Sequence, residues 1–149
     1  MCGGVVVDIA DDTFIWIHKC TDSKESNELK DYKLFCFNGE PRLTLVCSDR
    51  FSEQGLHEDF FDNDWTHQNI ARPNTPNSVI PIEKPYCFDE MLNLSRKLSK
   101  DIPFARIDFY EIQKCPYFGE ITFFPASGMN GFVPDDIDVE LGRKISLSI

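Results

Sequence analysis

The chain has 149 residues, of which 42% are hydrophobic and 27% charged, and this composition predicts a single globular domain with a substantial core. The formal net charge of −10 argues against nucleic acid as a partner, because binding to a phosphate backbone needs clustered lysine and arginine. An acidic chain can still bind an anionic nucleotide through Mg²⁺ and a few local cations. No stretch reaches the roughly 20 apolar residues of a membrane span, and the N-terminus lacks the basic region of a secretory signal. We therefore expect a cytoplasmic protein without a membrane span.

The six cysteines do not have the spacing of a zinc site, since none forms a Cys-x-x-Cys pair and none clusters with histidine. A secreted disulfide framework is one interpretation. Buried free thiols in a cytosolic protein are the better one, because a free cysteine packs as a small hydrophobic side chain.

The first half of the chain predicts short strands. Val5–Val7 and Phe14–Ile17 are apolar enough to form two short buried strands. Further on, two runs rich in β-formers, Tyr32–Phe37 and Arg42–Cys47, flank the pair Asn38-Gly39. Both turn residues tolerate positive φ, so this pattern predicts a β-hairpin.

Residues 49–85 show little periodicity and are rich in Asn, Asp, Pro and Ser. The aromatic residues Phe60, Phe61 and Trp65 lie among them and favour a long loop packed onto the body of the domain.

Two helices are predicted in the second half. In the segment 88–100, the apolar positions follow a 3.6-residue period, with acids in the first turn and lysines in the last. A second helix is expected from about Asp135 to Ile145, after Pro134 and with acids in its first turn.

Between these helices, two alternating segments predict an antiparallel strand pair, Ala105–Ile112 and Tyr117–Phe124. The alternation places Arg106 and Asp108 on one face of the first strand and Glu120 and Thr122 on one face of the second.

If these faces of the two strands lie on the same side of the sheet, the side chains predict a metal-binding site. Two carboxylates, Asp108 and Glu120, and the hydroxyl of Thr122 are hard oxygen donors of the kind that Mg²⁺ prefers. Arg106 lies on the face of Asp108 and either contacts a phosphate or pairs with an acid. The alternative is a surface strand pair whose charges are solvated.

The strand pair resembles the end of the ATP-grasp domain. In that family an Arg-x-Asp-Phe-like strand is followed, after a short turn, by Glu-x-Asn and a Pro-Gly-like loop. The order and spacing are the same in Arg106-Ile-Asp108-Phe109 and Glu120-Ile-Thr122, and Pro125-Ala-Ser-Gly128 stands at the position of the loop.

Three longer runs are similar to the TupA-like branch of ATP-grasp proteins, which is associated with bacterial capsular and other cell-surface polysaccharide synthesis. In chain order they are Asp31-Tyr-Lys-Leu-Phe-Cys-Phe-Asn-Gly-Glu-Pro41, Phe61-Asp-Asn-Asp-Trp65 and Lys84-Pro-Tyr-Cys-Phe-Asp-Glu-Met91. Several long motifs in one order are far more specific than one short pattern. Thr122 replaces the general ATP-grasp Asn, as in the TupA-like branch, and Ala126 stands where that branch usually has Gly.

The resemblance implies an α+β fold, the C-terminal lobe of an ATP-grasp protein, with an antiparallel sheet and flanking helices. It also implies ATP and Mg²⁺ as cofactors, and activation of a carboxylate as an acyl phosphate for a small-molecule or glycan acceptor. In this interpretation Asp108 and Glu120 hold Mg²⁺ with help from Thr122, and Arg106 is the catalytic residue that steadies phosphate.

The resemblance suggests further candidates for the site. Lys33 either approaches a nucleotide phosphate or is an outward-facing strand lysine, and Ser127 and Gly128 would shape the loop beside the metal. Arg50 could contact phosphate or acceptor, while Asp62, Asp64 and Trp65 either line an acceptor site or anchor the long loop.

The glycine-rich loop of a first ATP-grasp lobe is not found in the sequence. We therefore expect residues 1–30 to be a divergent N-terminal segment and residues 31–149 to be a partial ATP-grasp domain, active as a ligase-like enzyme only where the first lobe is supplied. The alternatives are a truncated, non-catalytic remnant or binding module, and a polysaccharide-associated, glycosyltransferase-like protein. The last of these would normally need a Rossmann-like βαβ pattern, which is absent.

Overall fold

The computed structural model describes residues 4–9, 13–18, 29–49, 53 and 55–147. Strands β1 (Gly4–Ile9) and β2 (Thr13–His18) pair with each other and form a separate two-stranded sheet. Both short strands predicted near the N-terminus are therefore confirmed as strands, while the burial of their side chains lies outside the described residues.

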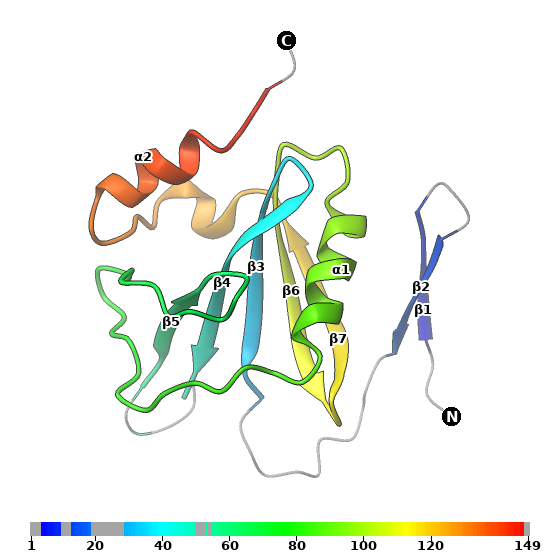
Figure 1. Ribbon diagram of the computed structural model, residues 1–149, viewed down its shortest axis with the longest axis horizontal. Coiled ribbons are helices and arrows are strands. Elements are labelled where there is room, and N and C mark those ends of the chain that lie inside the picture. Colours follow the sequence, from blue (N-terminus) through cyan, green and yellow to red (C-terminus); the bar gives the residue numbers. More distant parts are fainter. Residues whose placement is uncertain (1–3, 10–12, 19–28, 50–52, 54, 148–149) are drawn as a thin grey trace.

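The main sheet has five antiparallel strands in the order β5-β4-β3-β6-β7 (Figure 1). Its strands are β3 (Asp31–Phe37), β4 (Glu40–Ser48), β5 (His57–Phe61), β6 (Phe104–Ile112) and β7 (Cys115–Thr122). Together with α1 (Phe88–Leu98) and α2 (Asp136–Gly142), they confirm the α+β class and the antiparallel sheet with flanking helices.

The predicted hairpin is confirmed. Asn38 and Gly39 have φ values of 51° and 81° and join β3 to β4. This is the left-handed backbone that an Asn-Gly turn adopts at low cost. The same device joins β6 to β7, because Gln113 and Lys114 also have positive φ. Strand β7 therefore begins at Cys115 and ends at Thr122, two residues earlier at each end than predicted.

Helix α1 covers one face of the sheet. All five residues of its predicted apolar face are buried: Phe88, Met91, Leu92, Ser95 and Leu98. They pack on inward-facing residues of the central strands, among them Leu34 of β3 and Ile107 of β6. The predicted period is therefore confirmed.

The opposite face of the sheet carries a second apolar cluster and also the residues of the candidate site. Phe35 and Phe37 of β3 and Phe60 of β5 pack there with Phe132 from the segment that precedes α2. Helix α2, which lies against this cluster, is shorter than the predicted 135–145 helix. Since β3 alternates between the two faces, Asp31 and Lys33 lie on the α2 side, in line with Phe35.

The prediction that residues 49–85 form a long loop is wrong for one part of this segment. It contains strand β5, which pairs with β4 along His57–Phe61 and was not expected. The remaining residues that the structure describes in this segment are irregular. They are packed onto the body, as predicted, because the Trp65 ring stacks on Phe61 with centroids 4.3 Å apart.

Four cysteines fall within the described side chains. Cys36 and Cys87 are buried free thiols, as predicted, and Cys47 is also buried. Burial raises the pKa of Cys36 to about 11. Cys115 is exposed, which corrects the prediction for that residue, because it begins β7 directly after the turn of the β6–β7 hairpin. Cys2 and Cys20 lie outside the described residues.

Candidate functional site

A cluster of charged side chains lies on the α2 face of the three strands β3, β6 and β7. Strand register builds it. Lys33 of β3 is paired with Asp108 of β6, and Arg106 of β6 is paired with Thr122 of β7. Paired residues of an antiparallel sheet project to the same face, so the five-residue set is completed by Glu120, two residues before Thr122.

A β-bulge adjusts the position of Glu120. Ile107 pairs with Ile121 and Phe109 pairs with Phe118, so Asp108 alone faces two residues of β7, Gly119 and Glu120. Such an extra residue bends a strand and re-aims its side chains. The bulge lets Glu120 share the face of Asp108 and Thr122.

Arg106 is the centre of the cluster. Its Nε and Nη2 donate to the two carboxylate oxygens of Asp108, each at 2.7 Å. Nη2 also donates to Glu120 Oε1 at 2.8 Å and to Thr122 Oγ1 at 3.1 Å. All four residues that the sequence assigned to metal and catalysis are therefore brought together.

Lys33 joins the cluster from β3. Its Nζ lies 2.6 Å from Asp108 Oδ2 and 2.6 Å from Asp31 Oδ2. The Lys33 side chain is only 12% exposed, so it is not the outward, solvated strand lysine of the alternative interpretation. Asp31 was missed by the sequence analysis, although the alternation of β3 places it on the face of Lys33.

Burial and charge set the protonation of these groups. Burial raises the pKa of Asp108, although hydrogen bonds from Arg106 and Lys33 act against this shift. Burial alone would lower the pKa of Lys33 and of Arg106, but the neighbouring carboxylates outweigh it and raise both. The hydrogen bond from Thr122 is the main cause that lowers the pKa of Glu120. The two cations therefore stay charged at neutral pH.

The oxygen donors fit a cation. The side chains of Asp108, Glu120 and Thr122 each place an oxygen within 3.1 Å of one atom, Arg106 Nη2. This nitrogen stands in for a positive charge at the point where the three predicted ligands converge. Mg²⁺ binds such oxygens at about 2.0–2.1 Å. The same three donors could hold it once the Arg106 side chain rotates away and the side chains of Asp108, Glu120 and Thr122 move closer together. Only two of them are carboxylates, and the described residues contain no group of three or more His, Cys, Asp or Glu placed to hold a metal.

A polar cavity of about 570 Å³ opens over this cluster. Its lining combines charged and aromatic side chains from all three strands: Asp31, Lys33, Asp108, Tyr110, Phe118, Gly119 and Glu120. Its size is within the range of small-molecule sites, and its charges suit a ligand that carries both phosphates and a metal.

Gly119 allows β7 to approach Asp108 closely. A Cβ at this position would lie 3.2 Å from the Asp108 carbonyl oxygen and 3.3 Å from Tyr110 Cε2. We expect Gly119→Ala to lower the free energy of unfolding by about 1–3 kcal/mol, because the strands must separate to relieve the contact. Urea denaturation measures the change.

Gly142→Ala is the matched control for this substitution, because a Cβ at Gly142 meets no atom within 4 Å. Alanine is also the better helix former, so stability should stay constant or rise by up to about 1 kcal/mol. Equal destabilisation by both variants would contradict the close approach at Gly119.

Two other predicted residues, Ser127 and Gly128, are not joined to the cluster by hydrogen bonds. Ser127 and Gly128 belong to the 3-10 turn Pro125–Gly128, and no described hydrogen bond joins either of them to Asp108 or Glu120. Gly128 lines a second cavity instead. Arg50 lies outside the described residues.

Asp62 and Trp65 anchor the long loop. The Asp62 carboxylate accepts hydrogen bonds from the backbone of Asp64 and Thr66, and Trp65 Nε1 donates to the carbonyl of Ile82. Trp65 packs with the α1 cluster, on the face of the sheet opposite the charged residues. The anchoring interpretation is therefore confirmed.

Comparison with protein-family models matches one model, described as TupA-like ATPgrasp, over residues 11–146. The match begins upstream of Asp31, where the motif comparison started, and includes all the residues of the cluster. No curated protein matches the chain. No solved structure matches it either. Within the described part of the chain, no helix is long and apolar enough to cross a membrane.

Proposed function

This chain belongs to the TupA-like ATP-grasp family, and from that membership we propose that its charged cluster binds Mg·ATP and activates a carboxylate as an acyl phosphate. The reaction would take place in the cytoplasm. A nucleophile on a small-molecule or glycan acceptor would then bond to the acyl carbon as inorganic phosphate leaves, in the synthesis of a bacterial capsule or other cell-surface polysaccharide.

One observation supports the proposal most strongly. Oxygens of Asp108, Glu120 and Thr122, from two neighbouring strands, converge on a single cationic nitrogen of Arg106. A surface strand pair with solvated charges would not bring a buried carboxylate, an exposed carboxylate and a hydroxyl onto one point. Convergence on a cation is what a Mg²⁺ site requires.

Each residue has a role in the proposed reaction. A magnesium ion bound to Asp108, Glu120 and Thr122 would neutralise the charge of the transferring phosphoryl group. Lys33 would hold a phosphate oxygen, because its side chain lines the polar cavity. Without a ligand its ammonium group lies between the carboxylates of Asp31 and Asp108. Arg106, released from Asp108, would pair with the carboxylate or its phosphate. An oxygen of the substrate carboxylate would bond to the γ-phosphorus as the bond from that phosphorus to ADP breaks.

Isothermal titration of the protein with Mg·ATP tests the proposal. We expect binding with a Kd in the millimolar range or tighter, and a loss of at least about tenfold in Glu120→Gln. The Glu120 side chain is 61% exposed, so the substitution should leave the fold intact.

Glu40→Gln is the matched control, because Glu40 is also an exposed glutamate paired with an arginine, Arg96, at 3.1 Å. Its affinity for Mg·ATP should equal that of the original protein. Absence of heat in the original protein, or equal affinity in Glu120→Gln, would mean that the cluster only ties the three strands together.

A further inference from the structure

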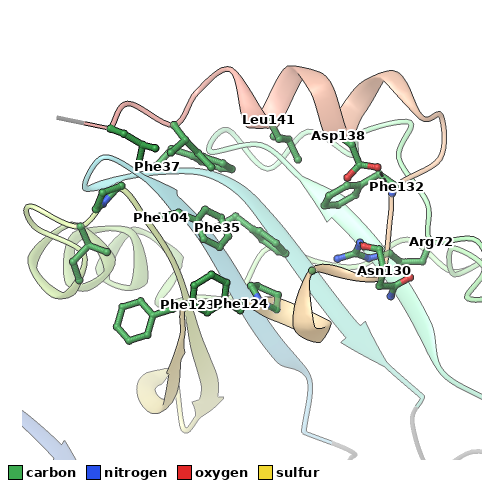
Figure 2. Close-up of a pocket in the computed structure, with 17 residues that line it drawn as sticks. Phe35, Phe37, Arg72, Phe104, Phe123, Phe124, Asn130, Phe132, Asp138 and Leu141 are labelled. Atoms are coloured by element: carbon green, nitrogen blue, oxygen red, sulfur yellow. Dashed lines mark hydrogen bonds between the residues drawn. The ribbon is translucent and has the colours of Figure 1, made fainter. Parts of the chain in front are cut away.

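A second cavity of about 720 Å³ lies on the same sheet face, between the sheet and the segment that carries α2. Its lining is mainly apolar and aromatic, with Phe35, Phe104, Phe124, Phe132 and Leu141 among its residues. Figure 2 shows Leu141 of α2 on one side of the cavity, Phe123 and Phe124 on the other, and Arg72 and Asn130 at one end. The cavity has the size and lining of a site for a small organic molecule.

Strands β3 and β6, which carry residues of the charged cluster, also carry residues that line this cavity. On β3, Lys33 belongs to the cluster and Phe35, two residues on, lines the cavity. On β6, Phe104 lines the cavity and Arg106 belongs to the cluster. Phe35 and Arg106 are direct cross-strand partners, so the two sites meet at this pair.

Arg72 places a positive charge at the wall of the cavity. It is 8% exposed, and its guanidinium lies over the ring of Phe132, 4.1 Å from the centroid. Nη1 donates to the carbonyls of Asn130 and Gly131, while Nε has no hydrogen-bond partner within the described part of the chain.

No carboxylate among the described residues forms an ion pair with this guanidinium. Burial lowers the pKa of Arg72, and repulsion from Arg106 lowers it further against the attraction of Glu58 and Asp138. Arg106, as the cross-strand partner of Phe35, lies beside the wall of the cavity. An anion placed at Arg72 would compensate for the burial of its charge.

Arg106 can contribute to such an anion site. Its hydrogen bonds to Asp108, Glu120 and Thr122 use Nε and Nη2, and Nη1 makes none within the described residues. A ligand carboxylate could accept a hydrogen bond from Nη1.

We propose that the apolar cavity is the site for the carboxylate substrate, which has an aromatic or aliphatic body along the phenylalanine walls and its carboxylate between Arg72 and Arg106. This inference rests on the proposed function, whose substrate class it narrows. A free sugar fits less well, because the phenylalanine walls would leave many of its hydroxyls without hydrogen bonds. The pairing of Phe35 with Arg106 places the apolar cavity beside the charged cluster, where the nucleotide phosphates would lie.

The first test needs no variant and no nucleotide. The protein is titrated with 4-phenylbutyrate, with the neutral analogue 4-phenylbutanol and with butyrate, and binding is followed by calorimetry. We expect phenylbutyrate to bind at least about tenfold more tightly than either of the other two, because only it offers both the anion and the apolar body. Equal affinity for the acid and the alcohol, or no binding of the acid, would overturn the proposal.

Substitutions at Phe124 and at Arg72 test the apolar and the charged part of the site. Phe124→Ala should weaken phenylbutyrate binding severalfold without unfolding the protein, since Phe124 is 81% exposed. Arg72→Gln should abolish the preference for the acid over the alcohol, and Arg72→Lys should retain part of it. Tyr86→Ala, at an exposed aromatic residue outside the cavity, is the control and should bind as the original protein does. Unchanged binding in Phe124→Ala would contradict the cavity as the site.

The failure of this inference is distinguishable from the failure of the proposed function. Phenylbutyrate binding without any binding of Mg·ATP would sink the proposed reaction and leave the cavity as an organic anion site. Binding of Mg·ATP without a preference for phenylbutyrate would sink the inference alone.

Discussion

Replacement of Asp108 by asparagine is expected to lower the free energy of unfolding by about 3–5 kcal/mol, the cost of leaving buried charges without their partner. The Asp108 side chain is 3% exposed and accepts hydrogen bonds from Lys33 and from two nitrogens of Arg106. An asparagine amide offers one oxygen and no charge, so each buried cation would lose one of its two carboxylate partners: Lys33 would keep only Asp31, and Arg106 only Glu120. Urea denaturation followed by circular dichroism measures the loss.

Asp89→Asn is the matched control. Asp89 also pairs with a lysine, Lys84, at 3.0 Å, but its side chain is 82% exposed. An exposed pair contributes at most about 1 kcal/mol, so the control should be nearly as stable as the original protein. If both variants lost the same small amount, the ion pairs of Asp108 would not hold the three strands together.

Phe88→Ala is expected to have an effect of similar size, about 3–5 kcal/mol, for a different reason. Phe88 begins α1, is fully buried and packs edge-on against Trp65, with ring centroids 4.7 Å apart. Loss of the ring leaves a cavity where the helix, the sheet and the long loop meet. The midpoint of urea denaturation should fall accordingly.

Tyr86→Ala removes another aromatic ring only two residues away. Because Tyr86 is 77% exposed, its loss should change the stability by no more than about 0.5 kcal/mol. A loss of stability in Phe88→Ala no greater than in this control would show that α1 is not fixed to the sheet by Phe88.

The elements that the sequence predicted are those with a local signal. The turn Asn38-Gly39 needs only its own backbone preference, and α1 needs only its periodic apolar face. Strand β5 has neither, because His57-Glu-Asp begins it with polar residues and its two apolar residues, Phe60 and Phe61, are buried on opposite faces of the sheet. It becomes a strand by pairing with β4, a tertiary contact that local pattern reasoning does not detect.

The same distinction holds within the site. The alternation of two adjacent strands, read together with the family motifs, was sufficient to group Arg106, Asp108, Glu120 and Thr122. The partnership of Lys33 with Asp108 depends on the register between β3 and β6, which are 75 residues apart at that point. Arg72 lies in an irregular segment and reaches its cavity only because residues 71–72 run beside the segment that leads to α2.

The most direct test of the central claim, a magnesium–nucleotide site at the β6–β7 pair, is a comparison of amide NMR spectra with Mg·ATP and with Mn·ATP. Paramagnetic Mn²⁺ has the same preference for oxygen ligands and broadens the signals of nearby amides. We predict that broadening is strongest at Asp108, Glu120 and Thr122, is weaker at the amides of α1 on the opposite face, and is lost in Glu120→Gln. Broadening centred elsewhere, or none when Mn·ATP is in excess, would contradict the account.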